Sequence, residues 1–200
     1  MAGLKISGVA CPNSSEILTS SRNHESIWRL HQRMKTIREN LLNCRGILVH
    51  GCNCQGVMGA GVAAAIRNRW PDVAQAYQNR YREKGLLLGG AVTVASTHNQ
   101  TAWSSLELID AWSPQLPAGV IVVNLLTQEF FGRDPNRVYV DYDALERGFR
   151  DIVRPLAHAT GLPVFFPLIG CGLANGSWDV VEGRIERALH DVADKTLVVL

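Results

Sequence analysis

The feature that most constrains this chain is a glycine-rich loop between an expected strand and an expected helix. An apolar, β-branched run over residues 46–50 predicts a buried strand, and glycines follow it at positions 51, 56, 59 and 61. A helix-favouring run begins near residue 60. Glycine lets backbone N–H groups approach a ligand closely, and a helix N-terminus adds unpaired donors and a positive dipole end. The pattern predicts an anion site, with phosphate as the favoured ligand.

These glycines fit neither of two known phosphate motifs. The chain has no Gly-Lys-Ser/Thr sequence of a P-loop at this position, and Gly56-x-x-Gly59-x-Gly61 reverses the order of the dinucleotide-binding motif. A nicotinamide-dependent oxidoreductase is therefore disfavoured, and we expect no cofactor. Close packing of a helix on a sheet also calls for small residues, so this loop alone leaves a purely structural role open.

A second loop of the same kind follows near the C-terminus. Residues 163–168 read as a buried strand, Gly170 and Gly172 follow, and Val181, Ile185 and Leu189 mark a helix over residues 178–193. In open α/β sheets, loops at the carboxyl ends of strands meet where ligands bind. Two facing backbone loops suit a diphosphate.

The remaining pattern alternates between the two element types. Strands are expected at 34–38, 46–50, 90–96, 119–127, 163–168 and 196–200, and helices across 60–83 with a break at Pro71, at 141–159 and at 178–193. This order predicts a three-layer α/β/α sandwich with a mixed central sheet. Residues 97–117 are too apolar for a solvated connection, so packing against a sheet edge is favoured, with a lid or a partner surface as alternatives.

Composition narrows the class of protein. With 200 residues, 46% of them hydrophobic, the chain suits one domain, and the net charge of +2 gives no reason to expect a polyanionic partner. The odd number of cysteines, five, predicts reduced thiols and a cytoplasmic protein. Cys52-x-Cys54 is too closely spaced for structural zinc, so we expect no metal, and the sequence offers no run long enough for a membrane span.

The two loops resemble the ligand loops of macro domains. The residues that carry the resemblance are His50-Gly51-Cys52-Asn53, Gly59-Ala60-Gly61-Val62, Ile169-Gly170-Cys171-Gly172-Leu173 and Trp178. They are most similar to the fungal ADP-ribose-1''-phosphate phosphatases and to small phage and bacterial macro domain proteins. The similarity begins at about Met34, so we expect residues 34–200 to be the macro domain and residues 1–33 to be an N-terminal extension, with a flexible arm as the favoured interpretation.

The resemblance implies how ADP-ribose would lie between the loops. Asn53 would bond the distal ribose and Asn40 would receive the adenine, although a turn role for Asn40 stays open. The first loop would face the diphosphate from one side and the second would close over it from the other. The implied ligand-binding residues are Asn40, Gly51, Cys52, Asn53, Gly59, Ala60, Gly61, Val62, Gly170, Cys171, Gly172, Leu173 and Ala174.

His50 is the expected catalytic residue, with Asn53 beside it. His50 matches the histidine of the fungal phosphatases, and an imidazole can act as a general acid, a general base or a nucleophile near neutral pH. Two residues depart from related patterns. Ser177 stands where many relatives have an acidic residue, and Ala174 stands where hydrolases that form a lysyl intermediate have an aspartate. A catalytic carboxylate would then come from Asp134, Asp141 or Asp143, of which Asp141 is well placed to cap a helix.

The implied function is recognition of ADP-ribose, with hydrolysis of ADP-ribose-1''-phosphate or another derivative at the distal ribose. The alternative is a non-catalytic reader or metabolite sink, which Ala174 and Ser177 favour. The expected partner is ADP-ribose or a derivative, without a membrane, and nucleic acid enters only as an ADP-ribosylated substrate.

Overall fold

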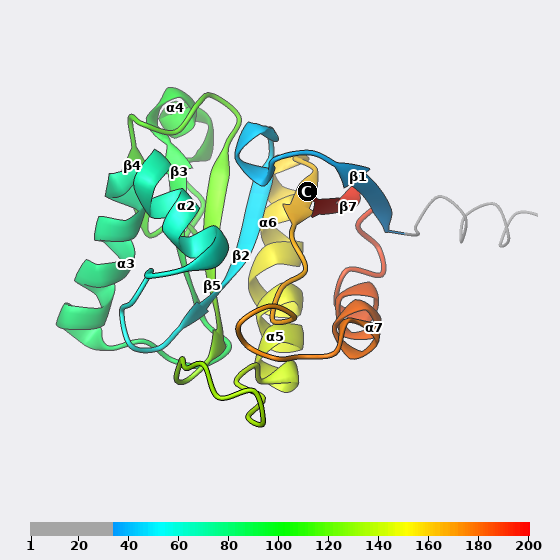
Figure 1. Ribbon diagram of the computed structural model, residues 1–200. Coiled ribbons are helices and arrows are strands. Elements are labelled where there is room, and N and C mark those ends of the chain that lie inside the picture. The colour runs from blue at the N-terminus through cyan, green and yellow to red at the C-terminus, as the bar shows by residue number, and fades with distance from the viewer. Residues whose placement is uncertain (1–33) are drawn as a thin grey trace, which may run out of the picture. The chain divides into compact units, whose positions relative to one another are not determined.

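A seven-stranded mixed sheet forms the centre of residues 34–200, which are the residues that the computed structural model describes (Figure 1). The strand order is β1-β7-β6-β2-β5-β3-β4. Neighbours are parallel except β3 and β5, which are antiparallel. The strands are β1 Lys35–Arg38, β2 Ile47–Asn53, β3 Ala91–Ser96, β4 Ala111–Ser113, β5 Ile121–Gln128, β6 Val164–Phe166 and β7 Lys195–Val199. The extension predicted for residues 1–33 lies outside the described residues.

The two central strands are buried on both faces. Almost every residue of β2 and β5 is inaccessible to solvent, which explains why both read as continuous apolar runs rather than as alternating ones. Their register is regular from Ile47 opposite Ile121 to Cys52 opposite Leu126, and it then shifts so that Asn53 pairs with Gln128. This irregularity marks the point where β2 ends and the first glycine loop begins.

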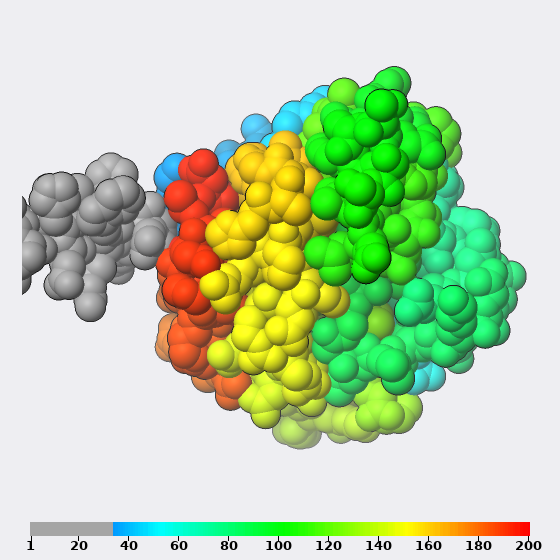
Figure 2. Space-filling view, turned by 180° about the vertical axis from the view of Figure 1, so that it is seen from behind, coloured from blue at the N-terminus to red at the C-terminus, as the bar shows by residue number. Residues whose placement is uncertain are grey.

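Helices cover both faces of the sheet, as the predicted sandwich requires. One face carries η1 Leu41–Asn43, α2 Gly61–Arg69 and α3 Pro71–Lys84, and Pro71 begins α3 as expected. The other face carries α5 Tyr142–Gly148, a π-helical turn η3 Phe149–Val153, α6 Arg154–Thr160 and α7 Trp178–Ala188. Figure 2 shows α7 beside the continuous stretch of α5, η3 and α6 on this second face. Helix α7 ends five residues before the predicted residue 193, and Lys195 Nζ donates to the carbonyls of Leu189 and Val192 beyond that end.

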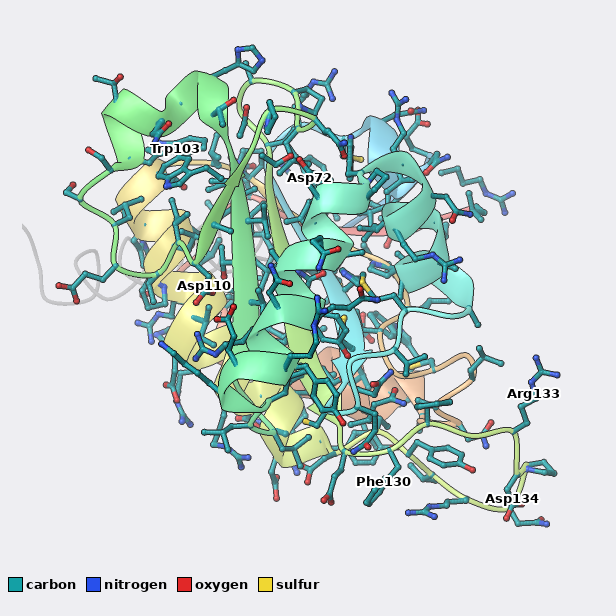
Figure 3. The ribbon with its side chains drawn as sticks, turned by 90° about the vertical axis from the view of Figure 1, so that its left-hand side faces the viewer. Asp72, Trp103, Asp110, Phe130, Arg133 and Asp134 are labelled. Carbon is teal, nitrogen blue, oxygen red and sulfur yellow. The ribbon has the colours of Figure 1, made fainter. Side chains whose placement is uncertain are left out.

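Residues 97–117 pack against the sheet edge. They form η2 Thr97–Asn99, α4 Gln100–Trp103 and β4, and they bury Trp103 and Leu116 (Figure 3). Asp110 extends the pairing along the outer edge of β3, because its N–H donates to the Thr93 carbonyl and its carboxylate accepts from the Thr93 N–H. In the structure this segment covers the edge rather than the glycine loops.

The five parallel strands β1, β7, β6, β2 and β5 end at one edge of the sheet. Three loops gather there, at the lower end of the sheet in Figure 1. We call them loop one (residues 54–60), the aromatic loop (residues 129–140) and loop two (residues 167–177). None of the helices in residues 34–200 has the length and hydropathy needed to cross a membrane.

Candidate ligand site at the carboxyl edge of the sheet

Loop one is organised by the side chain of Asn53. Its Oδ1 accepts hydrogen bonds from the backbone N–H groups of Gln55 (2.9 Å) and Val57 (3.3 Å), and its Nδ2 donates to the Val57 carbonyl (2.7 Å). Asn53 is only 7% exposed. The amide predicted to bind ribose is therefore mainly occupied with shaping its own loop, and one N–H of Nδ2 remains for a ligand.

Tyr77 and Tyr81, one turn apart on α3, pack against loop one. The Tyr77 hydroxyl is buried and donates to the Asn53 carbonyl at 2.5 Å, and it lies 3.1 Å from Asn53 Oδ1. Burial raises the pKa of Tyr77 well above its usual range, so the hydroxyl keeps its proton and stays a donor. Gly56 packs on the Tyr81 ring so closely that a Cβ there would lie 2.6 Å from it.

The N-terminus of α2 is open toward the loops. Ala60 is the N-cap and offers no side-chain hydrogen bond, and the first turn contains no acidic residue. Gly61 has φ of +57°, which a residue with a side chain adopts only with strain, and nothing lies within 4 Å of where its Cβ would be. The first-turn N–H groups and the positive end of the helix dipole are thus available to an anion.

Loop two is held by contacts with the end of the aromatic loop. Val140 fits between Gly170 and Gly176, where an added Cβ would lie 2.7 and 2.6 Å from its methyl groups. The Ala174 carbonyl accepts from Tyr139 N–H at 2.9 Å. Gly172 and Leu173 stay exposed, and no described atom lies within 4 Å of an added Cβ at Gly172. Loop two therefore presents an unobstructed backbone at its tip.

Asn175 joins loop two to the aromatic loop. Its Nδ2 donates to the carbonyls of Asp134 (2.9 Å) and Arg137 (2.8 Å). Asn175 is also the one non-glycine among residues 34–200 with a positive φ, at 56°, a conformation that asparagine tolerates better than most residues. A single side chain thus bridges the Asp134–Arg137 turn of the aromatic loop.

The prediction that the strand ends at His50 is wrong. Strand β2 continues to Asn53, and the His50 side chain is 1% exposed inside the sheet. Its Nε2 lies 2.8 Å from Asn124 Oδ1, while Asn124 Nδ2 donates to the Val92 carbonyl. Because Oδ1 is the acceptor in this chain of bonds, Nε2 of His50 carries a proton. Burial lowers the pKa of His50 to about 4, so the enclosed imidazole is neutral near pH 7.

The other predicted residues divide by burial. Cys52 and Ala174 are buried side chains, and burial raises the pKa of the Cys52 thiol far above its usual range. Gly51 lies in β2 and closely approaches Thr127 Oγ1. Asn40 caps η1 through its Oδ1, which accepts from Leu42 N–H, and is itself exposed. The residues accessible at the loops are Gly59, Ala60, Gly61, Val62, Gly170, Cys171, Gly172 and Leu173.

The three candidate carboxylates also differ in their positions. Asp141 caps α5 by accepting from Ala144 N–H at 2.8 Å, as predicted. Asp143 pairs with Arg184 on α7. Asp134 is exposed on the aromatic loop and accepts from Asn136 N–H in a local turn. Ser177 precedes α7 without a side-chain cap bond.

Sequence reasoning missed Tyr77, Asn124 and Asn175, which fix the loops and the buried histidine. Asn124 lies directly opposite His50 in the β2–β5 register, so correct strand pairing would have identified it. The signal for Asn175 was an Asn-Gly pair within a loop, which is typical of a left-handed turn. Tyr77 gave no signal, since helical spacing marks it only as a core residue.

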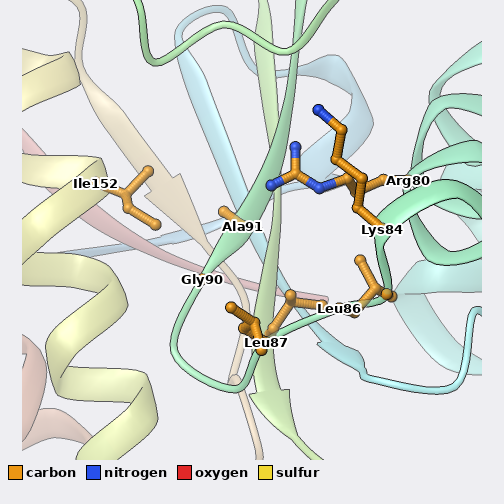
Figure 4. Close-up of a pocket in the computed structure, with 9 residues that line it drawn as sticks. Arg80, Lys84, Leu86, Leu87, Gly90, Ala91 and Ile152 are labelled. Atoms are coloured by element: carbon orange, nitrogen blue, oxygen red, sulfur yellow. The ribbon is translucent and has the colours of Figure 1, made fainter.

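A separate hollow of about 280 Å³ lies between the end of α3 and the start of β3 (Figure 4). Arg80, Lys84, Leu87 and Ile152 line it, and it includes none of the predicted site residues. Within residues 34–200, His, Cys, Asp and Glu side chains form no group of three suited to a metal ion.

Comparison with known proteins finds one family model and several relatives. A family model described as Macro domain matches residues 49–104. An ADP-ribose 1''-phosphate phosphatase of Scheffersomyces stipitis is 27% identical over 76% of this chain and 88% of its own length. A DNA ADP-ribosyl glycohydrolase of Mycobacterium tuberculosis is 25% identical over 76% of this chain. That alignment spans only 37% of the mycobacterial protein.

Solved structures agree on the architecture. The structure of Thermosipho africanus DarTG in complex with ADP-ribose superposes with a TM-score of 0.61 at 21% identity, over 84% of this chain and 41% of that one. Identity at this level shows the fold alone. The fold of this chain is that of solved macrodomains, and its sequence is similar to proteins of the macro domain family.

Proposed function

We propose that this protein binds ADP-ribose at the carboxyl edge of its sheet, with the diphosphate between the N-terminus of α2 and the tip of loop two. The observation that carries the proposal is the open first turn of α2, which has no capping side chain and no acidic residue. Gly61 and Gly172 leave the approach to this turn and to loop two clear of side chains. An anion at this position gains N–H donors and the helix dipole together.

The two ends of the ligand would then contact two asparagines. The remaining N–H of Asn53 Nδ2 is available to a hydroxyl of the distal ribose, and the exposed Asn40 at the end of β1 is available to the adenine. Both contacts follow from the macro domain resemblance and from the positions of Asn40 and Asn53 at the carboxyl ends of the parallel strands β1 and β2.

We further propose that the protein hydrolyses an ADP-ribose derivative at the distal ribose. The support is that relatives aligned over three-quarters of this chain are named as hydrolases, one of ADP-ribose 1''-phosphate and one of ADP-ribosylated DNA. The proton-transfer role predicted for His50 is not part of this proposal, because the imidazole is enclosed and neutral. We expect the protein to act in the cytoplasm. The four cysteines among the described residues are free thiols, which agrees with a reducing compartment.

A non-catalytic reader is the second candidate, and the enclosure of His50 favours it. Burial of His50, together with Ala174 and Ser177 in loop two, supports binding more than it supports chemistry.

Calorimetry with ADP-ribose tests the binding proposal, and incubation with ADP-ribose-1''-phosphate, ADP-ribosylated protein and ADP-ribosylated DNA tests the hydrolysis. Binding with turnover of any of these substrates supports the enzyme. Binding without turnover supports the reader, and no binding at millimolar ADP-ribose contradicts both.

A further inference from the structure

Within residues 34–200, no strand covers the outer edge of β3 at its start. Strand β4 pairs with β3 only from Val94 to Ser96, and Asp110 extends this pairing to Thr93. The uncovered edge of a sheet presents backbone N–H and C=O groups that can pair with another chain. Ala91, the first residue of β3, therefore lies at an open edge.

The backbone groups of Ala91 face this edge. In an antiparallel pair, alternate residues exchange hydrogen bonds with the neighbouring strand, and the residues between them face away from it. The Leu126 N–H donates to the Gly90 carbonyl, and the Ser96 N–H donates to the Val120 carbonyl, so the even-numbered residues of β3 bond β5. The N–H and C=O of Ala91 therefore point outward, where β4 does not reach them.

The open edge forms part of the hollow of about 280 Å³ (Figure 4). Ala91 lines this hollow, with Arg80 and Lys84 of α3 on one side of β3 and η3 on the other. The apolar side chains that line it are Leu86, Leu87, Leu126 and Ile152. A ligand there meets cations, an apolar surface and an open backbone edge at once.

The charge in the hollow is positive. Arg80 Nη1 lies 3.2 Å from Asp110 Oδ1, and the same carboxylate accepts from the Thr93 N–H, so this pair is neutral overall. Lys84 lies in the last turn of α3 and forms no salt bridge within residues 34–200. Its ammonium group is therefore available to an anionic ligand.

From these features we infer that the hollow binds the C-terminal residue of an extended peptide that ends in an apolar side chain. The last residue pairs with Ala91 as an antiparallel strand does: its N–H donates to the Ala91 carbonyl, and its carboxylate accepts from the Ala91 N–H. Lys84 balances the charge of the carboxylate, and the apolar side chain packs on the leucines of the hollow. The inference goes beyond the proposed function and does not depend on it.

Two smaller ligands match the hollow less completely. A simple aliphatic acid has no N–H to donate to the Ala91 carbonyl, so this acceptor gains no partner. A free amino acid carries an ammonium group, which Arg80 and Lys84 repel. The outward donor and acceptor of Ala91, taken together with the cations, therefore favour a peptide terminus.

The test follows backbone amide shifts of the full chain during titration with four probes at millimolar concentration. They are N-acetyl-Ala-Leu with a free carboxylate, its C-terminal amide, N-acetyl-Ala-Gly with a free carboxylate, and hexanoate. The first probe should shift the Ala91 amide and bind roughly 10-fold more tightly than its amide form, because the hydrogen bond to a charged acceptor is stronger. The glycine-ended probe lacks the apolar side chain and hexanoate lacks the N–H, so both should bind more weakly than the first probe.

Charge reversal at Lys84 separates the carboxylate contact from general effects. Lys84→Glu should weaken binding of N-acetyl-Ala-Leu severalfold and change that of its amide form much less. Arg82→Glu is the matched control, because Arg82 lies in the same last turn of α3 but donates to Asn79 and does not line the hollow. It should leave both affinities close to those of wild type.

Ala91→Pro tests the backbone contact. Proline removes the outward N–H without removing a bond to β5, and an edge strand tolerates it at such a position. The variant should bind N-acetyl-Ala-Leu roughly 10- to 100-fold more weakly. A thermal melt establishes that it folds, and if it does not fold, the comparison of Lys84→Glu with Arg82→Glu decides.

Equal affinities for the free and amidated dipeptide, equal effects of the two charge reversals, or no shift at Ala91 would overturn the inference. Hexanoate that binds as tightly as N-acetyl-Ala-Leu would overturn the assignment to a peptide. Lys84→Glu should keep wild-type affinity for ADP-ribose, since the hollow contains no residue of the proposed site. Failure of the wild-type chain to bind ADP-ribose would contradict the proposed function alone.

Discussion

Loop one and loop two share a sequence pattern but are supported in different ways. Loop one is shaped by Asn53 and by Tyr77 and Tyr81 beneath it, on the α2–α3 face. Loop two is held by Val140 and Asn175 through the aromatic loop, at the opposite side of the site. The difference teaches that loop one is held by Asn53 and by α3, whereas the position of loop two depends on the aromatic loop.

The largest expected effect is on the anion site of loop one. Gly61→Glu places a carboxylate at the open N-terminus of α2, where the phosphates should lie, and should weaken ADP-ribose binding by more than about 100-fold, since like charges and bulk act together. Gly61→Ala is the control, because it shares the backbone strain at positive φ without adding charge. Calorimetry that gives both variants the same affinity would move the phosphates away from α2.

The next largest expected effect is the change in the free energy of unfolding with pH that His50 causes. Its pKa is lowered from 6.5 to about 4 in the folded protein, so between these pH values only the unfolded chain binds the proton. Stability is therefore complete above pH 6.5 and falls by up to about 1.4 kcal/mol per pH unit toward pH 4. Urea denaturation of wild type and His50→Gln should differ in slope over this window, and parallel slopes would show that His50 is not buried and neutral.

A smaller effect, on stability and on ADP-ribose affinity, is expected from the tyrosine of α3 that supports loop one. Tyr77→Phe removes the hydroxyl that bonds the Asn53 carbonyl and should cost about 0.5 to 1.5 kcal/mol of stability, together with a severalfold loss of ADP-ribose affinity. Tyr81→Phe is the matched control one helical turn away, since the 40%-exposed Tyr81 supports Gly56 with its ring rather than its hydroxyl. If Tyr77→Phe leaves the affinity unchanged, loop one holds its shape without α3.

The smallest effect is expected from removal of residues 1–33. Every residue that we place in the site lies between Asn40 and Ser177, so the shortened protein should bind ADP-ribose with wild-type affinity. A shortened protein that is insoluble or fails to bind would make the N-terminal segment part of the domain.

The sequence predicted the elements well because their signals are local. The apolar runs of β2 and β5, the break at Pro71 and the Asp141 cap each depend on neighbouring residues. The two glycine loops were located correctly for the same reason. Gly61 begins α2 and Gly172 lies in the exposed part of loop two, and the ligand-binding roles that the resemblance implied for them stay predictions.

The misplacement of His50 has a physical cause. The expected strand stopped at residue 50, but pairing with β5 carries β2 on to Asn53 and turns the imidazole into the interior opposite Asn124. Bonds between residues distant in sequence were equally hidden, such as those of Tyr77 to Asn53 and of Asn175 to Asp134. Such contacts depend on tertiary packing, which periodicity does not encode.

The central claim is that ADP-ribose lies between α2 and loop two, and amide chemical shifts during an ADP-ribose titration test it most directly. We predict that the largest shifts occur at the backbone amides of Gly59–Val62 and Gly170–Leu173, on the two sides of the site. Shifts concentrated instead around the hollow of Arg80, Lys84 and Ala91, or no shifts at saturating ADP-ribose, would contradict the account.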